Sequence, residues 1–177
     1  MHSRRRTLGD VSSIQNQIIQ TANSQGVPSS IALAVAQQES GFNQGAVGSA
    51  GELGVFQLEP QYFPGASDLN TNISTGISYL KQLYQQFGDW ATALAAYNWG
   101  PTNLANAQAA GTPIPGQVQG YVNSVLGIAG AGVSSDTSQT SDTAVATAAA
   151  PTGFDPSQVA PYVLAGVVGM GLWLAWR

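Results

Sequence analysis

Residues 31 to 57 read IALAVAQQESGFNQGAVGSAGELGVFQ, and both the fold and the chemistry of the chain depend on this stretch. Ile31, Val35 and Glu39 recur every four residues, so on a helix the carboxyl group of Glu39 continues an apolar stripe. Burial disfavours the charged form of a carboxyl group, and a Glu in such a place can still donate a proton at neutral pH. The stretch therefore predicts a general acid at the end of a helix.

The residues after Glu39 predict a loop that bends closely. Ser40 and Gly41 end the helix, and Gly48, Gly51 and Gly54 follow, so the backbone can wrap around whatever the acid faces. The spacing alone fits two interpretations equally well. Glu39 lies either at the rim of a groove or at a helix end with its head group in water.

The composition limits the classes of function. The chain has 177 residues, 44% of them hydrophobic, which suits one compact domain plus an appendage. Only 8% of residues are charged and the net charge is -4, so we expect no nucleic-acid partner, and three arginines at residues 4–6 are expected to be a solvated tail. With no cysteine and a single histidine, His2, we expect no disulfide, no metal and no cofactor. Catalysis must then use carboxylates and neutral polar groups.

Hydrophobic periodicity predicts an all-α domain over residues 10–126, behind a basic tail at residues 1–9. No pair of segments reads as paired strands. Asp10, Asn70 and Asp89 are the expected N-caps. The expected helices are at residues 10–25, 28–39, 52–58, 70–87, 90–99, 102–110 and 118–126, the third of them a brief helix preferred over a strand.

The C-terminal part differs in composition. Residues 127–158 are rich in Gly, Ala, Ser and Thr and cannot bury enough apolar surface to offset their chain entropy, so we expect a flexible linker. Residues 159–177 contain the uncharged run VAPYVLAGVVGMGLWLAW, which as a helix would be about 27 Å long, close to a hydrocarbon core of roughly 30 Å. We expect one transmembrane helix that anchors the protein in a lipid membrane. The alternative is a buried core helix, but behind a flexible linker it would have no core to join.

Two further stretches carry a resemblance to a known family. GELGVFQ at residues 51–57 and AYNWGP at residues 96–101 follow Glu39 and Ser40 in an order and at separations that resemble the soluble lytic transglycosylase domain. The resemblance covers about residues 10–126. It implies a lysozyme-like helical fold that cleaves the glycan strands of peptidoglycan.

The resemblance also implies roles for individual residues. Glu39 is the implied catalytic acid and base, and Gln117 stands where the family often has a Glu. Purely structural interpretations are also possible: core packing for Tyr97 and Tyr121, and backbone capping for Gln57. The residues implied to contact the glycan are Ser40, Ser49, Gln57, Tyr97, Asn98 and Tyr121.

The number of carboxylates bears on the reaction. Hydrolytic glycosidases usually need two, roughly 5 to 5.5 Å apart for retention or 6.5 to 9.5 Å apart for inversion. In this chain no second carboxylate has an obvious place, and the lytic reaction implied by the resemblance needs none, because the C6 hydroxyl of muramic acid closes on C1 to give a 1,6-anhydro product. Two alternatives stay open: a hydrolytic lysozyme of the same fold, with Glu52 or Glu59 positioning a water, and a non-catalytic glycan-binding module.

The membrane topology that the sequence predicts conflicts with the location of the peptidoglycan substrate. No apolar run of the secretory kind follows Met1, so export by a cleaved signal is not expected. A single C-terminal span would leave residues 1–158 on the cytoplasmic side, whereas peptidoglycan lies on the other. We therefore expect a virion-associated enzyme of a membrane-containing tailless phage, carried in the virion's internal membrane and used for local wall penetration. A transglycosylase of a bacterial secretion or conjugation apparatus in the cell envelope is the alternative.

Overall fold

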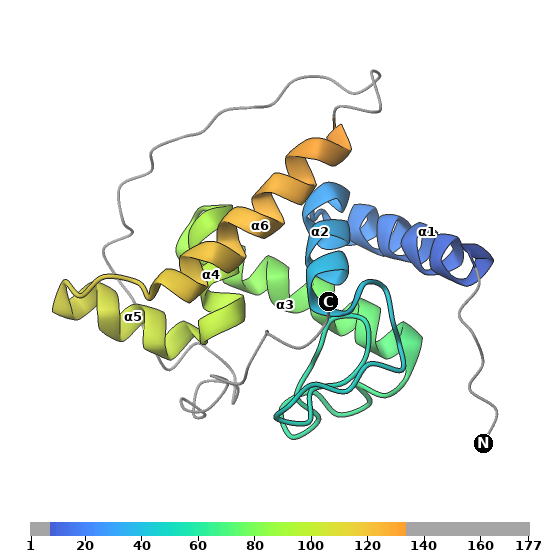
Figure 1. The fold of residues 1–177 in the computed structure, drawn as a ribbon, viewed down its shortest axis with the longest axis horizontal. Helices are drawn as coiled ribbons and strands as arrows, with labels where there is room; N and C mark the ends of the chain where they lie inside the picture. The colour runs from blue at the N-terminus through green and yellow to red at the C-terminus, as the bar shows by residue number, and fades with distance from the viewer. Residues whose placement is uncertain (1–7, 134–177) are drawn as a thin grey trace. The chain divides into compact units, whose positions relative to one another are not determined.

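The computed structural model describes residues 8–133, which form six α-helices and one long loop between the second and third helices (Figure 1). Among these residues the β-structure is confined to two isolated bridges, so the all-α prediction is confirmed for them. None of the helices described is long and apolar enough to cross a bilayer. The expected anchor at residues 159–177 and most of the expected linker lie outside the described residues. The helices are α1 (Leu8–Gln25), α2 (Ser29–Ser40), α3 (Leu69–Phe87), α4 (Trp90–Trp99), α5 (Pro101–Ala110) and α6 (Gly116–Val133).

The chain divides into two compact units, Met1–Ser78 and Tyr79–Arg177, with the boundary inside α3. In the first unit α1 packs against α2. Three of the five residues that α2 buries are alanines, and their small side chains let neighbouring backbones approach closely. Helix α2 is therefore a core helix whose last turn carries Glu39. The buried residues of the pair are Ile14, Ile18 and Ala22 on α1, and Ile31, Ala32, Ala34, Val35 and Ala36 on α2.

In the second unit α4 packs against both α5 and α6. Four successive residues of α4, numbers 93–96, are buried, as expected for a helix covered on more than one side. Gly100, with φ of 94°, and Pro101 separate α4 from α5, and the proline occupies the first helical position, where its missing N–H is not needed. The predicted break before residue 101 is thus confirmed.

The helix caps agree with prediction at one helix and differ at two. The Oδ1 of Asp89 accepts a hydrogen bond from the Thr92 N–H at 2.8 Å, so Asp89 caps α4 as predicted. Helix α3 is capped by Asp68, not by Asn70, because the helix begins one residue before Asn70 and a cap must precede the first turn. Asp10 lies inside the first turn of α1, where its negative charge complements the N-terminal end of the helix dipole.

The cap of α3 predicts a pH dependence. Asp68 is exposed, and hydrogen bonds from the Thr71 N–H and then the Thr71 hydroxyl hold its pKa below the ordinary value of 3.8. A lowered folded pKa adds stability that is present above the unfolded pKa and is lost as pH falls through the folded pKa. We expect Asp68→Asn to melt below wild type at pH 7, with the difference shrinking below about pH 4. Thermal melts of both proteins between pH 7 and pH 3 test this, and a constant difference would contradict it.

Most predicted helix ends differ from the structure by one or two residues, and two differences are larger. Residues 52–58 form turns and bridges, not a brief helix, because Gly51 and Gly54 adopt positive φ of 92° and 77° and the backbone of Leu53 pairs with that of Leu58. Helix α6 continues to Val133, seven residues beyond the expected end at residue 126. Ala129 is buried at helical spacing from Val125, and the burial of this apolar position favours the extension of the helix into the Gly- and Ala-rich stretch.

Candidate active site

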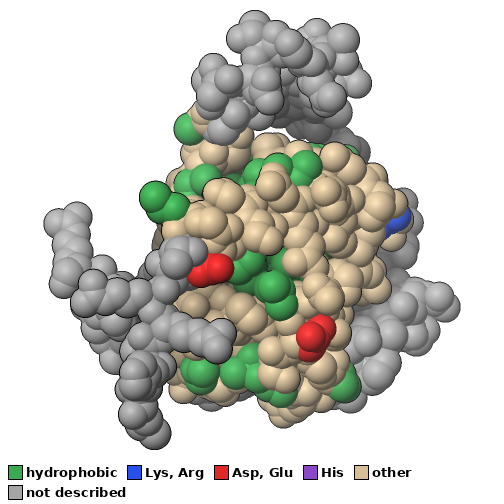
Figure 2. Space-filling model, turned by 90° about the vertical axis from the view of Figure 1, so that its right-hand side faces the viewer, with side chains coloured by type: hydrophobic (Ala, Val, Ile, Leu, Met, Phe, Trp, Pro, Cys, Tyr) green, Lys and Arg blue, Asp and Glu red, His purple; other side chains and the backbone are tan. Residues whose placement is uncertain are grey.

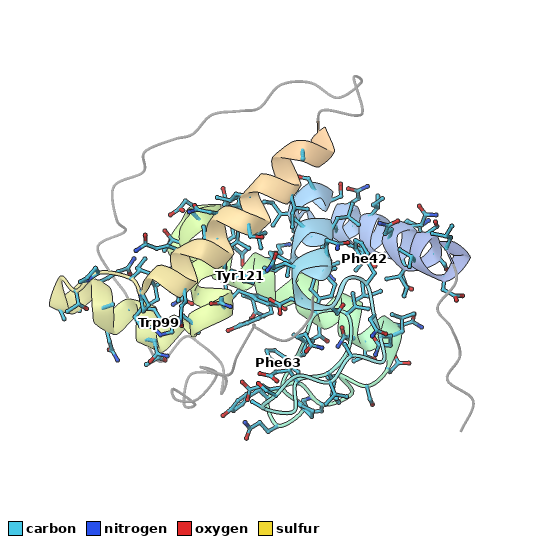
Figure 3. The ribbon with its side chains drawn as sticks, in the orientation of Figure 1. Phe42, Phe63, Trp99 and Tyr121 are labelled. Carbon is cyan, nitrogen blue, oxygen red and sulfur yellow. The ribbon has the colours of Figure 1, made fainter. Side chains whose placement is uncertain are left out.

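The C-terminal end of α2 places Glu39, which is partly buried in the last helical turn. Gly41 follows in the left-handed conformation, and its N–H and that of Phe42 bond back to the carbonyls of Gln37 and Ala36. Phe42 also has a positive φ of 63°, and its side chain is buried just after the helix (Figure 3). The burial of this aromatic ring holds the sharp turn in place, so the position of Glu39 is fixed by its own helix end.

Ser40 connects the end of α2 to the loop that follows. Its hydroxyl donates to the Val55 carbonyl at 2.9 Å and accepts from the Asn43 N–H at 3.0 Å. The bond to Val55 joins the turn that carries Glu39 to the segment that carries Gln57, and the bond from Asn43 holds the turn itself. Ser40 therefore positions the acid's surroundings, and its predicted contact with the glycan stays a prediction.

Gln57 has an unusual backbone conformation, with a positive φ of 45°. Its side-chain Nε2 donates to the Gly54 carbonyl at 2.8 Å and to the Ala46 carbonyl at 3.4 Å. The capping interpretation of this residue is thus correct. The Gln57 Oε1, in contrast, accepts no hydrogen bond from the part of the chain that the structure describes. A strained residue with a free acceptor is typical of a binding site.

Asn72 organises the loop from inside, and the sequence prediction missed it. The side chain is fully buried; its Oδ1 accepts from the Phe56 N–H and its Nδ2 donates to the carbonyls of Leu53 and Ala66, each at 2.8 Å. The side-chain amide of Gln44 also bonds backbone groups of this loop. The sequence feature that could have identified Asn72 is its position as a polar residue directly beside the apolar stripe of α3.

Ser49, the remaining predicted contact in the first unit, is exposed in the turn closed by the hydrogen bond from the Gly48 N–H to the Glu52 carbonyl at 2.8 Å. In the first unit Ser40, next to Glu39, is therefore hydrogen-bonded to the segment that leads to Gln57, and Ser49 lies on another turn of the same loop.

The other predicted residues lie in the second unit. Tyr97 is partly buried on α4, and its ring centroid is 5.6 Å from that of Tyr79 on α3. Asn98 is exposed, and its amide makes no hydrogen bond within residues 8–133. Tyr121 on α6 is 8% exposed, as its core-packing interpretation requires (Figure 3). Gln117, at the departure from the family pattern, is exposed in the first turn of α6.

Four acidic residues besides Glu39 already serve local structure. Asp68 and Asp89 are helix caps. The Oε2 of Glu52 accepts from the Ala50 N–H at 3.0 Å, and the Oε2 of Glu59 accepts from the Gln61 amide at 2.8 Å. Charged side chains are few on the face shown in Figure 2. Among residues 8–133 no three His, Cys, Asp or Glu side chains group as metal ligands would.

Comparison with known proteins adds to this geometry. The soluble lytic murein transglycosylase of Escherichia coli K12 is 37% identical over an alignment of 127 residues, and the match covers 56% of this chain and 20% of that protein. The transglycosylase of Enterobacteria phage PRD1 is 35% identical over 101 residues, covering 54% of this chain and 38% of that protein. The chain therefore spans only about a fifth of the length of the first of these relatives.

Solved structures share the fold. The 70 kDa soluble lytic transglycosylase of Escherichia coli matches with a TM-score of 0.55 at 28% identity, and the lytic transglycosylase Slt of Pseudomonas aeruginosa with 0.57 at 24%. Each match covers 64% of this chain and 23% of the other. The family model described as the transglycosylase SLT domain matches residues 16–112. Because this match covers more than half of the chain, and the helical fold agrees with it, the protein belongs to the transglycosylase SLT domain family.

Proposed function

We propose that this protein is a peptidoglycan lytic transglycosylase in which Glu39 acts first as the acid and then as the base. The observation that carries the proposal is the position of Glu39 in the last turn of a buried helix, joined through Ser40 to the Gln57 loop, in a chain of the SLT family. The murein transglycosylase of Escherichia coli, a relative with the same domain, supports peptidoglycan as the substrate.

The proposed reaction breaks the β-1,4 bond between N-acetylmuramic acid and N-acetylglucosamine. The protonated carboxyl of Glu39 gives its proton to the glycosidic oxygen, and the bond from that oxygen to C1 of the muramic residue breaks. The carboxylate then takes the proton of the C6 hydroxyl, whose oxygen bonds to C1 and closes a 1,6-anhydro ring. Glu39 is protonated again, and no water is consumed. Assistance by the substrate's own acetamido group would stabilise the positive charge that develops at C1.

The local use of the other carboxylates favours this reaction over hydrolysis. A hydrolytic enzyme needs a second carboxylate that is free to act as nucleophile or to activate water. Glu59 is bonded to Gln61, and Asp68 and Asp89 cap helices. Glu52 keeps one unbonded oxygen, so it would be the candidate for the second carboxylate if hydrolysis is observed.

Mass spectrometry of the fragments that the full chain releases from purified peptidoglycan tests the proposal. We expect muropeptides with anhydro ends, each lighter by one water molecule than the fragments that a hydrolytic lysozyme releases from the same preparation. Reducing muramic ends in the presence of the protein would make it a hydrolase. Binding without any release of fragments would favour the non-catalytic glycan-binding module.

We further propose that the protein is carried in the internal membrane of a virion, anchored by residues 159–177, and opens the wall locally during infection. The uncharged run at residues 159–176 and the relative from phage PRD1 support this proposal. The protein should remain with the lipid fraction of purified particles and give a clearing band on a peptidoglycan gel. Deletion of residues 159–177 should release an active enzyme from that fraction. Recovery only from uninfected cell envelopes would instead favour a bacterial secretion or conjugation apparatus.

A further inference from the structure

Gly48 leaves a space that two other side chains occupy. A Cβ atom added at Gly48 would lie 2.2 Å from the Oε2 of Glu52 and 2.9 Å from the Oε1 of Gln57. Both oxygens therefore lie beside the same point, directly over the α-carbon of Gly48. No further atom fits at this point, but both side chains are partly exposed, so a bound molecule can approach their oxygens.

The orientation of the Gln57 amide is fixed by its partners. Its nitrogen faces the carbonyl oxygens of Gly54 and Ala46, which only accept hydrogen bonds, so the NH₂ group must lie on that side. The Oε1 is thereby directed toward Glu52. The amide oxygen of Gln57 thus lies near the Oε2 of Glu52, whose donor is the Ala50 N–H.

Neither side chain has its full set of donors. Glu52 accepts one hydrogen bond, from the Ala50 N–H to Oε2, and its Oε1 accepts none within the described residues. The Gln57 Oε1 also accepts none there. Two converging acceptors repel each other unless a donor lies between them, and acceptors that are partly removed from water gain from such a donor.

We propose that Glu52 and Gln57 form an acceptor subsite that binds an N–H donor of the peptidoglycan substrate and makes Glu52 a specificity-determining residue. The inference rests on the proposed function for the identity of the substrate. Peptidoglycan offers N–H donors from two sources: the acetamido groups of the sugars and the ammonium groups of the peptide stems. A charged acceptor strengthens either bond, and its contribution is larger for an ammonium group.

Kinetics on soluble glycan strands test the subsite. Hydrogen bonds to charged groups contribute about 1.5–3 kcal/mol, so we expect Glu52→Ala to raise KM by about tenfold or more while kcat changes little. The matched control is Glu59→Ala, which removes an acid of the same loop whose carboxylate is bonded to Gln61. Equal KM values for wild type, Glu52→Ala and Glu59→Ala would show that only water occupies the subsite and would overturn the proposal.

A second variant separates the subsite from the stability of the loop. Gly48→Ala adds a Cβ at the point that the Glu52 carboxylate occupies, and the clash is with the flexible ends of two side chains, not with backbone. We expect this variant to displace the carboxylate and reproduce the KM of Glu52→Ala, with a melting temperature close to that of wild type. A wild-type KM for Gly48→Ala would contradict the geometry.

Two comparisons identify the donor. On strands from which an amidase has removed the peptide stems, wild type and Glu52→Ala should converge if the donor is an ammonium group, and should still differ if it is an acetamido N–H. Glu52→Gln keeps an acceptor but no charge, so it should resemble Glu52→Ala in the first case and wild type in the second.

If wild type cleaves nothing, the proposed function fails and the subsite is tested by binding alone. Calorimetry of the same strands with Glu39→Gln and with Glu39→Gln combined with Glu52→Ala should then show weaker binding by the double variant. Equal affinities would overturn the subsite.

Discussion

Replacing Glu39 by glutamine is expected to abolish the release of fragments from peptidoglycan. A positioned general acid contributes about 10²- to 10⁴-fold to a rate, and in the proposed reaction the same group also acts as the base. Glutamine is nearly isosteric but cannot transfer the proton. The melting temperature should stay at or above that of wild type, because the substitution removes an ionisable group that is partly buried. The rate of release of soluble fragments and thermal melts measure the two effects.

The matched control is Glu59→Gln, which makes the same chemical change in the loop after Gln57. Its rate should remain close to that of wild type, since the Glu59 carboxylate bonds the Gln61 side chain. Substantial activity of Glu39→Gln would refute the single-acid mechanism. A large loss of stability in that variant would mean that the loss of rate reports unfolding and not chemistry.

The second large effect is expected at Asn72. Asn72→Leu removes the buried acceptor of the Phe56 N–H and one of the two donors that each of the Leu53 and Ala66 carbonyls has. A buried group that loses its partner costs about 1–3 kcal/mol, so the free energy of unfolding should fall by about 1–3 kcal/mol. The cleavage rate should fall too, because the same bonds hold the segment that leads to Gln57. Denaturant unfolding gives the stability, and the release assay gives the rate.

A matched control exists on the same helix. Ser74 is exposed, and its hydroxyl bonds only the Thr71 carbonyl one turn earlier, so Ser74→Ala should change stability by no more than about 0.5 kcal/mol. Asn72→Asp keeps the acceptor for the Phe56 N–H but turns a buried carboxylate oxygen toward the Leu53 and Ala66 carbonyls, and should destabilise at least as much as Asn72→Leu. Equal stability of Asn72→Leu and wild type would show that the buried amide does not hold the loop.

Phe56 shows why this segment depends on α3. A Cβ atom at Gly76 would lie 2.5 Å from the Cγ of Phe56, so the ring occupies the space that the missing side chain leaves, one helical turn after Asn72. The polar contact at Asn72 and the apolar contact at Gly76 hold the same residue. The segment next to Gln57 is thus fixed by two positions of α3.

Most of the helical framework could be predicted because its determinants are local. The stripe that begins at Ile73 and Ile77 and the stops at Gly88 and Gly100 act within one or two turns, and the structure has the corresponding helices and breaks. The N-cap of α3 was misplaced by two residues, since Asp68 and Asn70 are both good caps and the sequence does not say which of them precedes the first turn.

The sequence by itself determined the all-α class, the position of Glu39 at the end of α2 and the family to which the chain belongs. The tertiary structure decided the conformation of the loop between α2 and α3, including the positive φ of Gln57 and the convergence of Glu52 and Gln57 over Gly48. The physical reason is the range of the interactions. A helix is set by contacts three or four residues apart, whereas this loop is held by bonds from Asn72 to Phe56, sixteen residues apart, and from Gln44 to Ser67, twenty-three residues apart. No local pattern records such pairs, and they form only when α3 folds back against the loop.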